Sequence, residues 1–388
     1  MNDPFAEIRP YADNEVAEVL ARLLSDNEML DTVAAFRFGA VARALPFLMR
    51  PAVRYYLSRE VRNVASVGDL QAVLRHYMDR MIASTTAGFT VAGLENLDAQ
   101  TPYLFMSNHR DIAMDPAFTN YALHSQSRDT VRIAIGDNLL TKPWVSDLMR
   151  LNKSFIVRRR ASAPRELLAR SRQLSDYIRY SLQEERAPIW IAQREGRAKD
   201  GLDRTEPAII KMLTLGRNKA SEDFSGYIAA LNIVPVAISY ELDPCDAAKA
   251  NELWQRRECG NYAKGEQEDV ASIGKGIAGN KGRVHVCFGS PLGEGFATPA
   301  EVAREIDRQI ISNYCLHPTN LQAYRMQGGD SAAAQGLHQE PGSVSEASFA
   351  ARIEAIPDAQ RGDALAIYAN AVRSKILLRE AGSEALAD

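Results

Sequence analysis

Helical spacing of apolar residues dominates the first part of the chain. From about Asn14 to Ala87, apolar side chains recur three and four positions apart, and strand-like alternation is almost absent. Pro46 and Pro51 each lack a backbone donor, so we expect them to divide the middle of this stretch into short helices. The pattern predicts an N-terminal helical region over residues 1–87.

Short apolar runs alternate with longer amphipathic stretches from about Gly88 onward. One amphipathic stretch, from Pro164 to Glu185, is predicted to place five apolar side chains on a single stripe, as a helix would: Leu167, Leu168, Leu174, Ile178 and Leu182. Such alternation is typical of an α/β domain, which we place at residues 88–325 as a mixed sheet flanked by helices. The predicted strands are Tyr103–Met106, Val131–Ile135, Ser154–Val157, Ile189–Ala192, Val234–Ser239 and Val284–Phe288.

Several later segments have recognisable local patterns. Thr298, Pro299 and Glu301 form a capping box with proline at the first helical position, which predicts a helix start. Residues 326–345 are rich in Gly, Ser, Ala and Gln, which predicts a linker before a short helical tail at 346–388. The glycine pattern from Gly274 to Gly279 follows no predicted strand, so we interpret it as a turn rather than a dinucleotide site.

Composition and charge exclude several classes of function. The 388 residues are 46% hydrophobic and 24% charged, the balance of a globular protein, and a net charge of −3 gives no general attraction to nucleic acid. Arginines interrupt the longest apolar stretch, from Met29 to Leu57, and the first twenty residues are acidic. We therefore expect no membrane-spanning helix and no secretory leader, and so a cytoplasmic protein. The four scattered cysteines are interpreted as thiols with packing roles.

The segment from Ser107 to Pro116 offers the clearest candidate chemistry. His109 follows a predicted strand, where α/β proteins tend to place ligand-facing loops, and Asp111 and Asp115 lie close by. A carboxylate that holds the imidazole in one tautomer would leave its other nitrogen free to accept a proton. The alternative is a histidine in a polar turn, with Asp115 serving only to cap the helix that Pro116 opens.

Two further predicted strands end in arginine. Ser154–Val157 precedes Arg158, and Ile189–Ala192 precedes Glu195-Gly196-Arg197. If these strands share a sheet, His109, Arg158 and Arg197 converge at one edge, where guanidinium groups beside a base can bind phosphate. A solvated surface run is the alternative for residues 158–160, and we expect it to hold for at least one of those arginines.

Together these blocks resemble the glycerolipid acyltransferase family, which includes glycerol-3-phosphate and 1-acylglycerol-3-phosphate acyltransferases. The resemblance covers roughly residues 88–292, and each block is weak alone while the four in family order are specific. The matching blocks are Asn108-His109 with Asp115, Phe155-Ile156-Val157-Arg158, Glu195-Gly196-Arg197 and Ile233-Val234-Pro235-Val236-Ala237-Ile238.

The resemblance implies an α/β enzyme of phospholipid biosynthesis that moves an acyl group from an acyl-CoA or acyl carrier protein thioester to a hydroxyl of glycerol 3-phosphate or a lysophospholipid. It implies that His109 is the general base and that an aspartate orients it. It also implies that the acceptor phosphate and glycerol are bound by Arg158, Glu195, Gly196 and Arg197, with Pro235 shaping the site near the donor. No metal and no cofactor besides the acyl donor is implied.

The sequence departs from the family pattern in its spacing. The family usually places four residues between the histidine and the aspartate, whereas five separate His109 from Asp115 and one separates it from Asp111. Both aspartates therefore stay candidates, and we favour Asp115 because it ends the block before the helix. Lys153 or Asn152 stands where the family often has glycine, and Gln193 stands where it often has proline.

No serine or cysteine is marked as a nucleophile beside His109, so direct attack by the acceptor is the simplest mechanism. Two other functions stay open: a metal-dependent phosphoesterase with His109, Asp111 and Asp115 as ligands, and a non-catalytic membrane-binding relative. The N-terminal region has an interfacial pattern that predicts peripheral binding to an anionic membrane, although an ordinary packed helical layer would give the same pattern. Its residues are Phe36, Phe38, Phe47, Leu48, Met49, Tyr55 and Tyr56, interleaved with Arg37, Arg43, Arg50 and Arg54.

Overall fold

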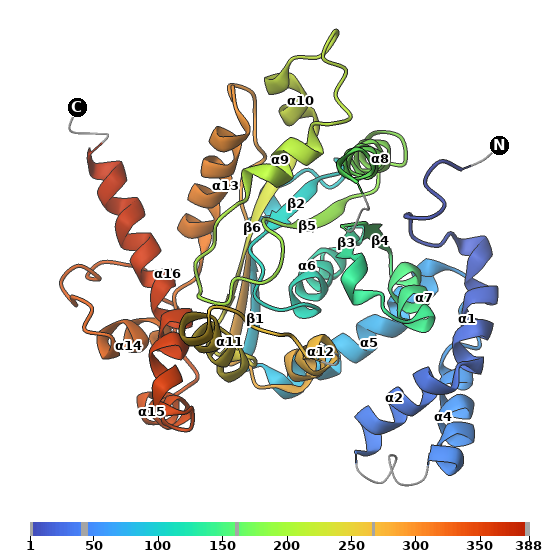
Figure 1. Ribbon diagram of the computed structural model, residues 1–388, viewed down its shortest axis with the longest axis horizontal. Helices are drawn as coiled ribbons and strands as arrows, with labels where there is room; N and C mark the ends of the chain where they lie inside the picture. The colour runs from blue at the N-terminus through green and yellow to red at the C-terminus, as the bar shows by residue number, and fades with distance from the viewer. Residues whose placement is uncertain (1–2, 40–45, 160–162, 266–267, 385–388) are drawn as a thin grey trace. The chain divides into compact units, whose positions relative to one another are not determined.

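A computed structural model describes residues 3–39, 46–159, 163–265 and 268–384 (Figure 1). The chain divides into two compact units. The first joins residues 1–80 to residues 131–180, and the second joins residues 81–130 to residues 181–388. The first unit therefore contains residues from both sides of position 87, the predicted end of the N-terminal helical region.

The first unit is mainly helical and has its own apolar core. Val16, Leu30 and Leu151 are fully buried in it, and Trp144 packs against it. A parallel pair of strands, β3 and β4, completes the unit. Its elements are α1 (Val16–Ser25), α2 (Asn27–Phe38), α4 (Pro46–Glu60), most of α5 (Val67–Thr85), β3 (Arg132–Gly136), α7 (Pro143–Leu151), β4 (Ser154–Val157) and most of α8 (Pro164–Gln183).

The second unit contains a mixed sheet in the order β1-β7-β6-β2-β5. Strand β2 runs parallel to both β5 and β6, whereas β6 and β7 are antiparallel. Every residue of β2 and of β6 is buried, as expected for central strands that read as unbroken apolar runs. The strands are β1 (Gly88–Ala92), β2 (Leu104–Ser107), β5 (Ile189–Ala192), β6 (Ile233–Tyr240) and β7 (Arg283–Phe288).

Helices flank this sheet, and further helices follow it in the C-terminal part of the chain. Helix α13 packs on β6, and the long helix α16 packs on α11, α13 and α14, as Figure 1 shows for the red end of the chain. The mixed α/β class predicted from the sequence is confirmed. The helices are α6 (Met114–Ser125), α9 (Pro207–Leu213), α10 (Phe224–Ala230), α11 (Asp246–Cys259), α12 (Glu268–Ala278), α13 (Pro299–Asn313), α14 (Pro318–Met326), α15 (Glu346–Glu354) and α16 (Asp358–Glu384).

Several local predictions are confirmed. The six predicted strands all form, with ends that agree within one residue. Thr298 caps α13 and accepts the amide of Glu301, whose carboxylate accepts the amide of Ala297 at 2.7 Å. No helix within the described residues is long and apolar enough to cross a membrane.

Two local predictions are wrong, and one strand was missed. Pro51 does not end a helix, because α4 begins at Pro46 and continues through Pro51 to Glu60. The strand β1 was not predicted, since Gly88–Ala92 is short and only partly buried. The glycines between residues 274 and 279 do not form a turn, because Gly274 and Gly276 lie inside α12.

Candidate active site

His109 follows β2 in a loop that is fixed to the neighbouring strand β6. The side chain of Asn108 is fully buried, and its amide nitrogen donates to the carbonyl of Ile238 at 3.0 Å. Its oxygen accepts the amide of Ile238 at 2.8 Å. Asn108 thus continues the ladder between the strands for one more residue, which fixes where His109 leaves the sheet.

The imidazole of His109 and the carboxylate of Asp115 form a hydrogen-bonded pair. Nδ1 of His109 lies 2.9 Å from Oδ2 of Asp115, which is fully buried in the first turn of α6. The same oxygen accepts the amides of Arg110 at 2.6 Å and Asp111 at 2.9 Å, and Oδ1 accepts the hydroxyl of Tyr240 at 2.6 Å. Four donors therefore fix the carboxylate that contacts His109.

This contact decides how the His109 ring can react. A carboxylate accepts a hydrogen bond, so Nδ1 carries a hydrogen and Nε2 of the neutral ring is a proton acceptor. The Trp190 ring meets the imidazole edge to face, with centroids 5.7 Å apart. The His109 side chain is 13% exposed. The ring is thus held from two sides while part of it stays accessible.

Asp111 has a different role from Asp115. Its Oδ1 accepts the amides of Ala113 and Met114 at 3.0 and 2.9 Å, so Asp111, and not Asp115, caps the start of α6. Burial, and the nearby Asp115 carboxylate, raise the pKa of Asp111. The structure therefore brings His109 together with Asp115 and uses Asp111 to begin the helix that carries Asp115.

The segment that contains Glu195, Gly196 and Arg197 runs beside His109. The amide of Ala198, directly after Arg197, donates to the carbonyl of His109 at 2.8 Å. Gly196 has a φ of 71°, in the left-handed region that favours glycine, and no atom lies within 4 Å of its would-be β-carbon. Glu195 is exposed. The sequence placed this segment at a strand exit near His109, and the structure has it there.

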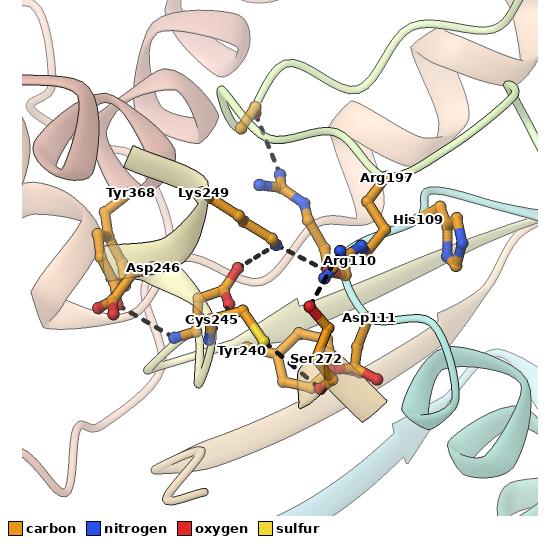
Figure 2. Close-up of polar contacts among 12 residues, drawn as sticks. His109, Arg110, Asp111, Arg197, Tyr240, Cys245, Asp246, Lys249, Ser272 and Tyr368 are labelled. Atoms are coloured by element: carbon orange, nitrogen blue, oxygen red, sulfur yellow. Dashed lines mark hydrogen bonds and ion pairs between the residues drawn. The ribbon is translucent and has the colours of Figure 1, made fainter. Parts of the chain in front are cut away.

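Arg197 carries a guanidinium whose bonding capacity is only partly used. Its Nη2 lies 3.4 Å from the hydroxyl of Ser272 in α12, as Figure 2 shows. Its Nη1 is buried and has no hydrogen-bond partner among the described residues. Such a donor, left unpaired, is costly unless a ligand or a water accepts from it. Arg197 is therefore suited to an anionic ligand.

Pro235 and Arg158 complete the predicted set. Pro235 lies in the buried strand β6 opposite Met106 of β2, and its carbonyl accepts the amide of Gly289 at 2.8 Å. Arg158 follows β4 in the first unit, where its guanidinium pairs with Glu7 at 2.7 Å. The predicted meeting of Arg158 with His109 and Arg197 stays a prediction, and Arg160 lies outside the described residues.

Four residues at the site were not singled out from the sequence. Trp190 and Tyr240 lie in apolar runs where their contacts with His109 and Asp115 are not visible. Ser272 lies just before the glycines that were interpreted as a turn, and Lys249 lies in a polar helical stretch although its side chain is fully buried. Only the proline-free, polar character of residues 246–259 could have suggested a helix there.

The proposed metal ligands are engaged in other contacts. Both oxygens of Asp115 accept hydrogen bonds from the protein, and one oxygen of Asp111 caps α6. Across the described ranges, no group of three or more His, Cys, Asp or Glu side chains is arranged to hold a metal ion. Both aspartate carboxylates are therefore already hydrogen-bonded within the protein.

Comparisons with known proteins bear on the class of this site. Residues 88–239 match the Acyltransferase family model. Among solved structures, the chain is similar to the 1-acyl-sn-glycerophosphate (LPA) acyltransferase PlsC from Thermotoga maritima, at 13% identity and a TM-score of 0.37. That similarity covers 73% of this chain and 92% of that one. No curated protein matches the sequence.

The family match contains both members of the His109–Asp115 pair and the segment Glu195–Arg197. It agrees with the family to which the sequence blocks were assigned. Residues 88–239 of this chain are therefore similar to the Acyltransferase family.

Proposed function

We propose that this protein transfers a fatty acyl group from an acyl-CoA or acyl carrier protein thioester to a hydroxyl of glycerol 3-phosphate or a lysophospholipid. The observation that carries the proposal is the contact of His109 Nδ1 with Asp115 at the exit of β2, within the matched region. A phospholipid-related role follows from the acceptor class that the motifs imply.

The proposed step is direct attack by the acceptor. The acceptor hydroxyl oxygen forms a bond to the thioester carbonyl carbon while Nε2 of His109 takes the hydroxyl proton. Asp115 stabilises the imidazolium through Nδ1–H, and the carbon–sulfur bond then breaks. The departing thiolate receives the proton from His109. Every atom is accounted for by the two substrates and one protein base, so the proposal includes neither metal nor cofactor.

Arg197 is the proposed acceptor contact. Its buried, unpaired Nη1 and its weakly bonded Nη2 present two donors with the spacing that a phosphate accepts. Gly196 has open space at its own β-carbon position, which allows a ligand to approach the backbone there. We extend the acceptor contacts to Glu195 and Arg158, and the donor side to Pro235, on the family resemblance alone.

The N-terminal helices are the proposed membrane contact. Phe36 and Phe38 in α2 are 62% and 49% exposed, and Tyr55 in α4 is 71% exposed. Exposed aromatic groups beside arginine suit the interface of a membrane with anionic lipids. Arg50 pairs with Asp31 at 2.5 Å, so its charge is partly neutralised, and Arg43 lies outside the described residues. We propose peripheral binding at the cytoplasmic face of a membrane.

Thiol release tests the proposal. Purified protein is mixed with acyl-CoA or acyl carrier protein thioester, and free thiol is followed with glycerol 3-phosphate, lysophosphatidate or another lysolipid as the added acceptor. We expect release that requires one acceptor, yields its acylated product and survives chelation. Phosphate release that is lost on chelation would instead indicate the phosphoesterase. No turnover with any donor and acceptor would favour the non-catalytic relative.

A further inference from the structure

Both backbone polar groups of Arg110, the residue after His109, are hydrogen-bonded to side chains. Its amide donates to Asp115 at 2.6 Å, and its carbonyl accepts the Lys249 ammonium at 2.7 Å. Figure 2 shows Lys249 reaching Arg110 from α11. The position of the loop that carries His109 therefore depends on a side chain that lies outside the matched acyltransferase region.

Lys249 is in turn held by a buried ionic group. Its ammonium forms an ion pair with Asp243, and burial is nearly complete, since 2% of Lys249 and 8% of Asp243 is exposed. A buried ion pair is weak evidence for stability, because well-packed apolar side chains often do as well. The Lys249–Asp243 pair is distinguished by its geometry, because the Lys249 ammonium also donates to the carbonyl of Arg110, the residue after His109.

The C-terminal helices α15 and α16 contact the turn from Asp243 to Asp246. The hydroxyl of Tyr368 in α16 accepts the amide of Asp243 at 3.1 Å and donates to Asp246 at 2.6 Å. Arg352 in α15 binds the carboxylate of Asp246 at 2.6 Å and the carbonyl of Asp243 at 2.9 Å. Two helices of the C-terminal tail thus fix the turn that contains Asp243, the ion-pair partner of Lys249.

A second route connects the same tail to the Arg110 side chain. The guanidinium of Arg110 donates to the carbonyl of Gly201 at 3.1 Å and to Asp203 at 2.7 Å. Gly201 has a φ of 77° and approaches the backbone of Ile367 in α16 so closely that no β-carbon would fit. Asn370, also in α16, donates to the carbonyl of Asp200 at 2.7 Å.

We propose that the C-terminal helices, acting through Lys249 and Tyr368, position the His109–Asp115 pair for catalysis. Both routes end on Arg110, whose amide holds the carboxylate that orients His109. Lys249 and Tyr368 are positioning residues, since their contacts are with the loop and not with the reacting groups. The inference rests on the proposed function of His109, and an error of about 1 Å in such a group can cost about 100-fold in rate.

Two variants of the full chain test the proposal. Tyr368→Phe removes one hydroxyl, and the double variant Lys249→Met with Asp243→Asn removes both charges without leaving either one unpaired. We expect kcat to fall about 10-fold or more in the double variant and less in Tyr368→Phe, with the KM values of both substrates nearly unchanged. Tyr227→Phe is the control, because Tyr227 is a buried tyrosine that donates to the Leu213 carbonyl, outside both routes.

A spectroscopic readout separates this proposal from the acyl-transfer proposal. The His109 ring is followed by NMR in protein with ¹³C-labelled histidine, and a His109→Gln spectrum assigns its resonance. A shifted His109 resonance in both variants, in a protein that transfers no acyl group, would support the positioning and contradict the acyl transfer. An active protein whose kcat is unchanged in the folded double variant would overturn the positioning. So would a His109 resonance that moves in neither variant.

Discussion

Gly276 in α12 lies directly against the carboxylate of Asp111. A β-carbon added at Gly276 would lie 2.7 Å from Cγ of Asp111, closer than packed atoms approach. Asp111 is 3% exposed and caps α6, so its side chain has little room to move. The glycine therefore allows α12, which also carries Ser272, to pack close to the loop of His109.

Gly276→Ala should destabilise the protein and impair catalysis. The new methyl group must displace Asp111 or α12, and overpacking of this kind costs about 1 to 3 kcal/mol. Thermal unfolding and initial rates measure the two effects. Gly274→Ala is the matched control in the same helix, since no atom lies within 4 Å of its β-carbon position. It should keep activity and gain up to about 1 kcal/mol. Equal behaviour of the two variants would contradict the close packing.

Arg197→Lys should weaken acceptor binding although it keeps the charge. A lysine cannot offer two donors to one phosphate as a guanidinium does. We expect the acceptor KM to rise about 10-fold or more, with a smaller change in the KM of the acyl donor. Ser272→Ala should have a smaller effect in the same direction, because its hydroxyl holds only one nitrogen of Arg197. A change confined to the donor KM would contradict the assignment.

Acid should destabilise the fold through His317. Burial lowers the pKa of His317 to about 4, against about 6.5 in an unfolded chain. The folded state therefore favours the neutral ring, so this contribution is complete above pH 6.5 and is lost as the pH falls toward 4. At about 1.4 kcal/mol per unit, the free energy of unfolding should drop by about 3 kcal/mol over that range.

Denaturant unfolding at several pH values measures this dependence. His317→Gln should flatten the curve between pH 6.5 and 4, whatever its effect at neutral pH. His338→Gln is the control, since the His338 side chain is 85% exposed. A His317→Gln curve parallel to that of the unmodified protein would show that another group causes the acid sensitivity.

The exposed aromatic residues of the N-terminal helices should promote membrane binding. We expect the protein to co-sediment with anionic vesicles, less so as salt is raised, because arginine charges are screened over about 10 Å at 0.1 M. Replacing Phe36, Phe38 and Tyr55 by serine should reduce pelleting at every salt concentration.

Two further proteins complete the membrane experiment. A variant with Arg43, Arg50 and Arg54 changed to glutamine should lose the salt-dependent part of the binding. Leu167→Ser with Leu168→Ser removes other exposed apolar side chains of the first unit and should leave the binding unchanged. Pelleting that is the same for all variants, or absent for all, would place the lipid contact elsewhere.

Local patterns carried much of the fold and the core of the site. The strands were visible because buried apolar runs of four to eight residues end at polar residues. The capping box at Thr298 and the strand exit at His109 are also properties of a few adjacent residues. His109 and Asp115 were found in this way, although spacing alone left Asp111 as an alternative. The structure distinguishes them, because Nδ1 of His109 contacts Asp115 whereas Asp111 accepts the amides at the start of α6.

The remaining features depend on partners distant in sequence. Lys249 lies in a polar helix and would be expected in water. Instead its ammonium contacts Arg110 and Asp243, and Asp243 contacts Tyr368, more than a hundred residues later in the chain. Gly276 lies inside a helix, where no turn requires glycine. The reason for a residue without a side chain is the Asp111 carboxylate that lies against it. No window of neighbouring residues contains either relationship.

The turnover of His109→Ala tests the central claim most directly. The purified variant, with thermal unfolding shown to match the unmodified protein, is assayed for acceptor-dependent thiol release and acylated product. We predict a fall of about 100-fold or more in kcat, as expected for loss of a general base. Asp115→Asn should be impaired more than Asp111→Asn, since Asp115 contacts the ring. A folded His109→Ala protein that transfers acyl groups at a near-normal rate would contradict the account.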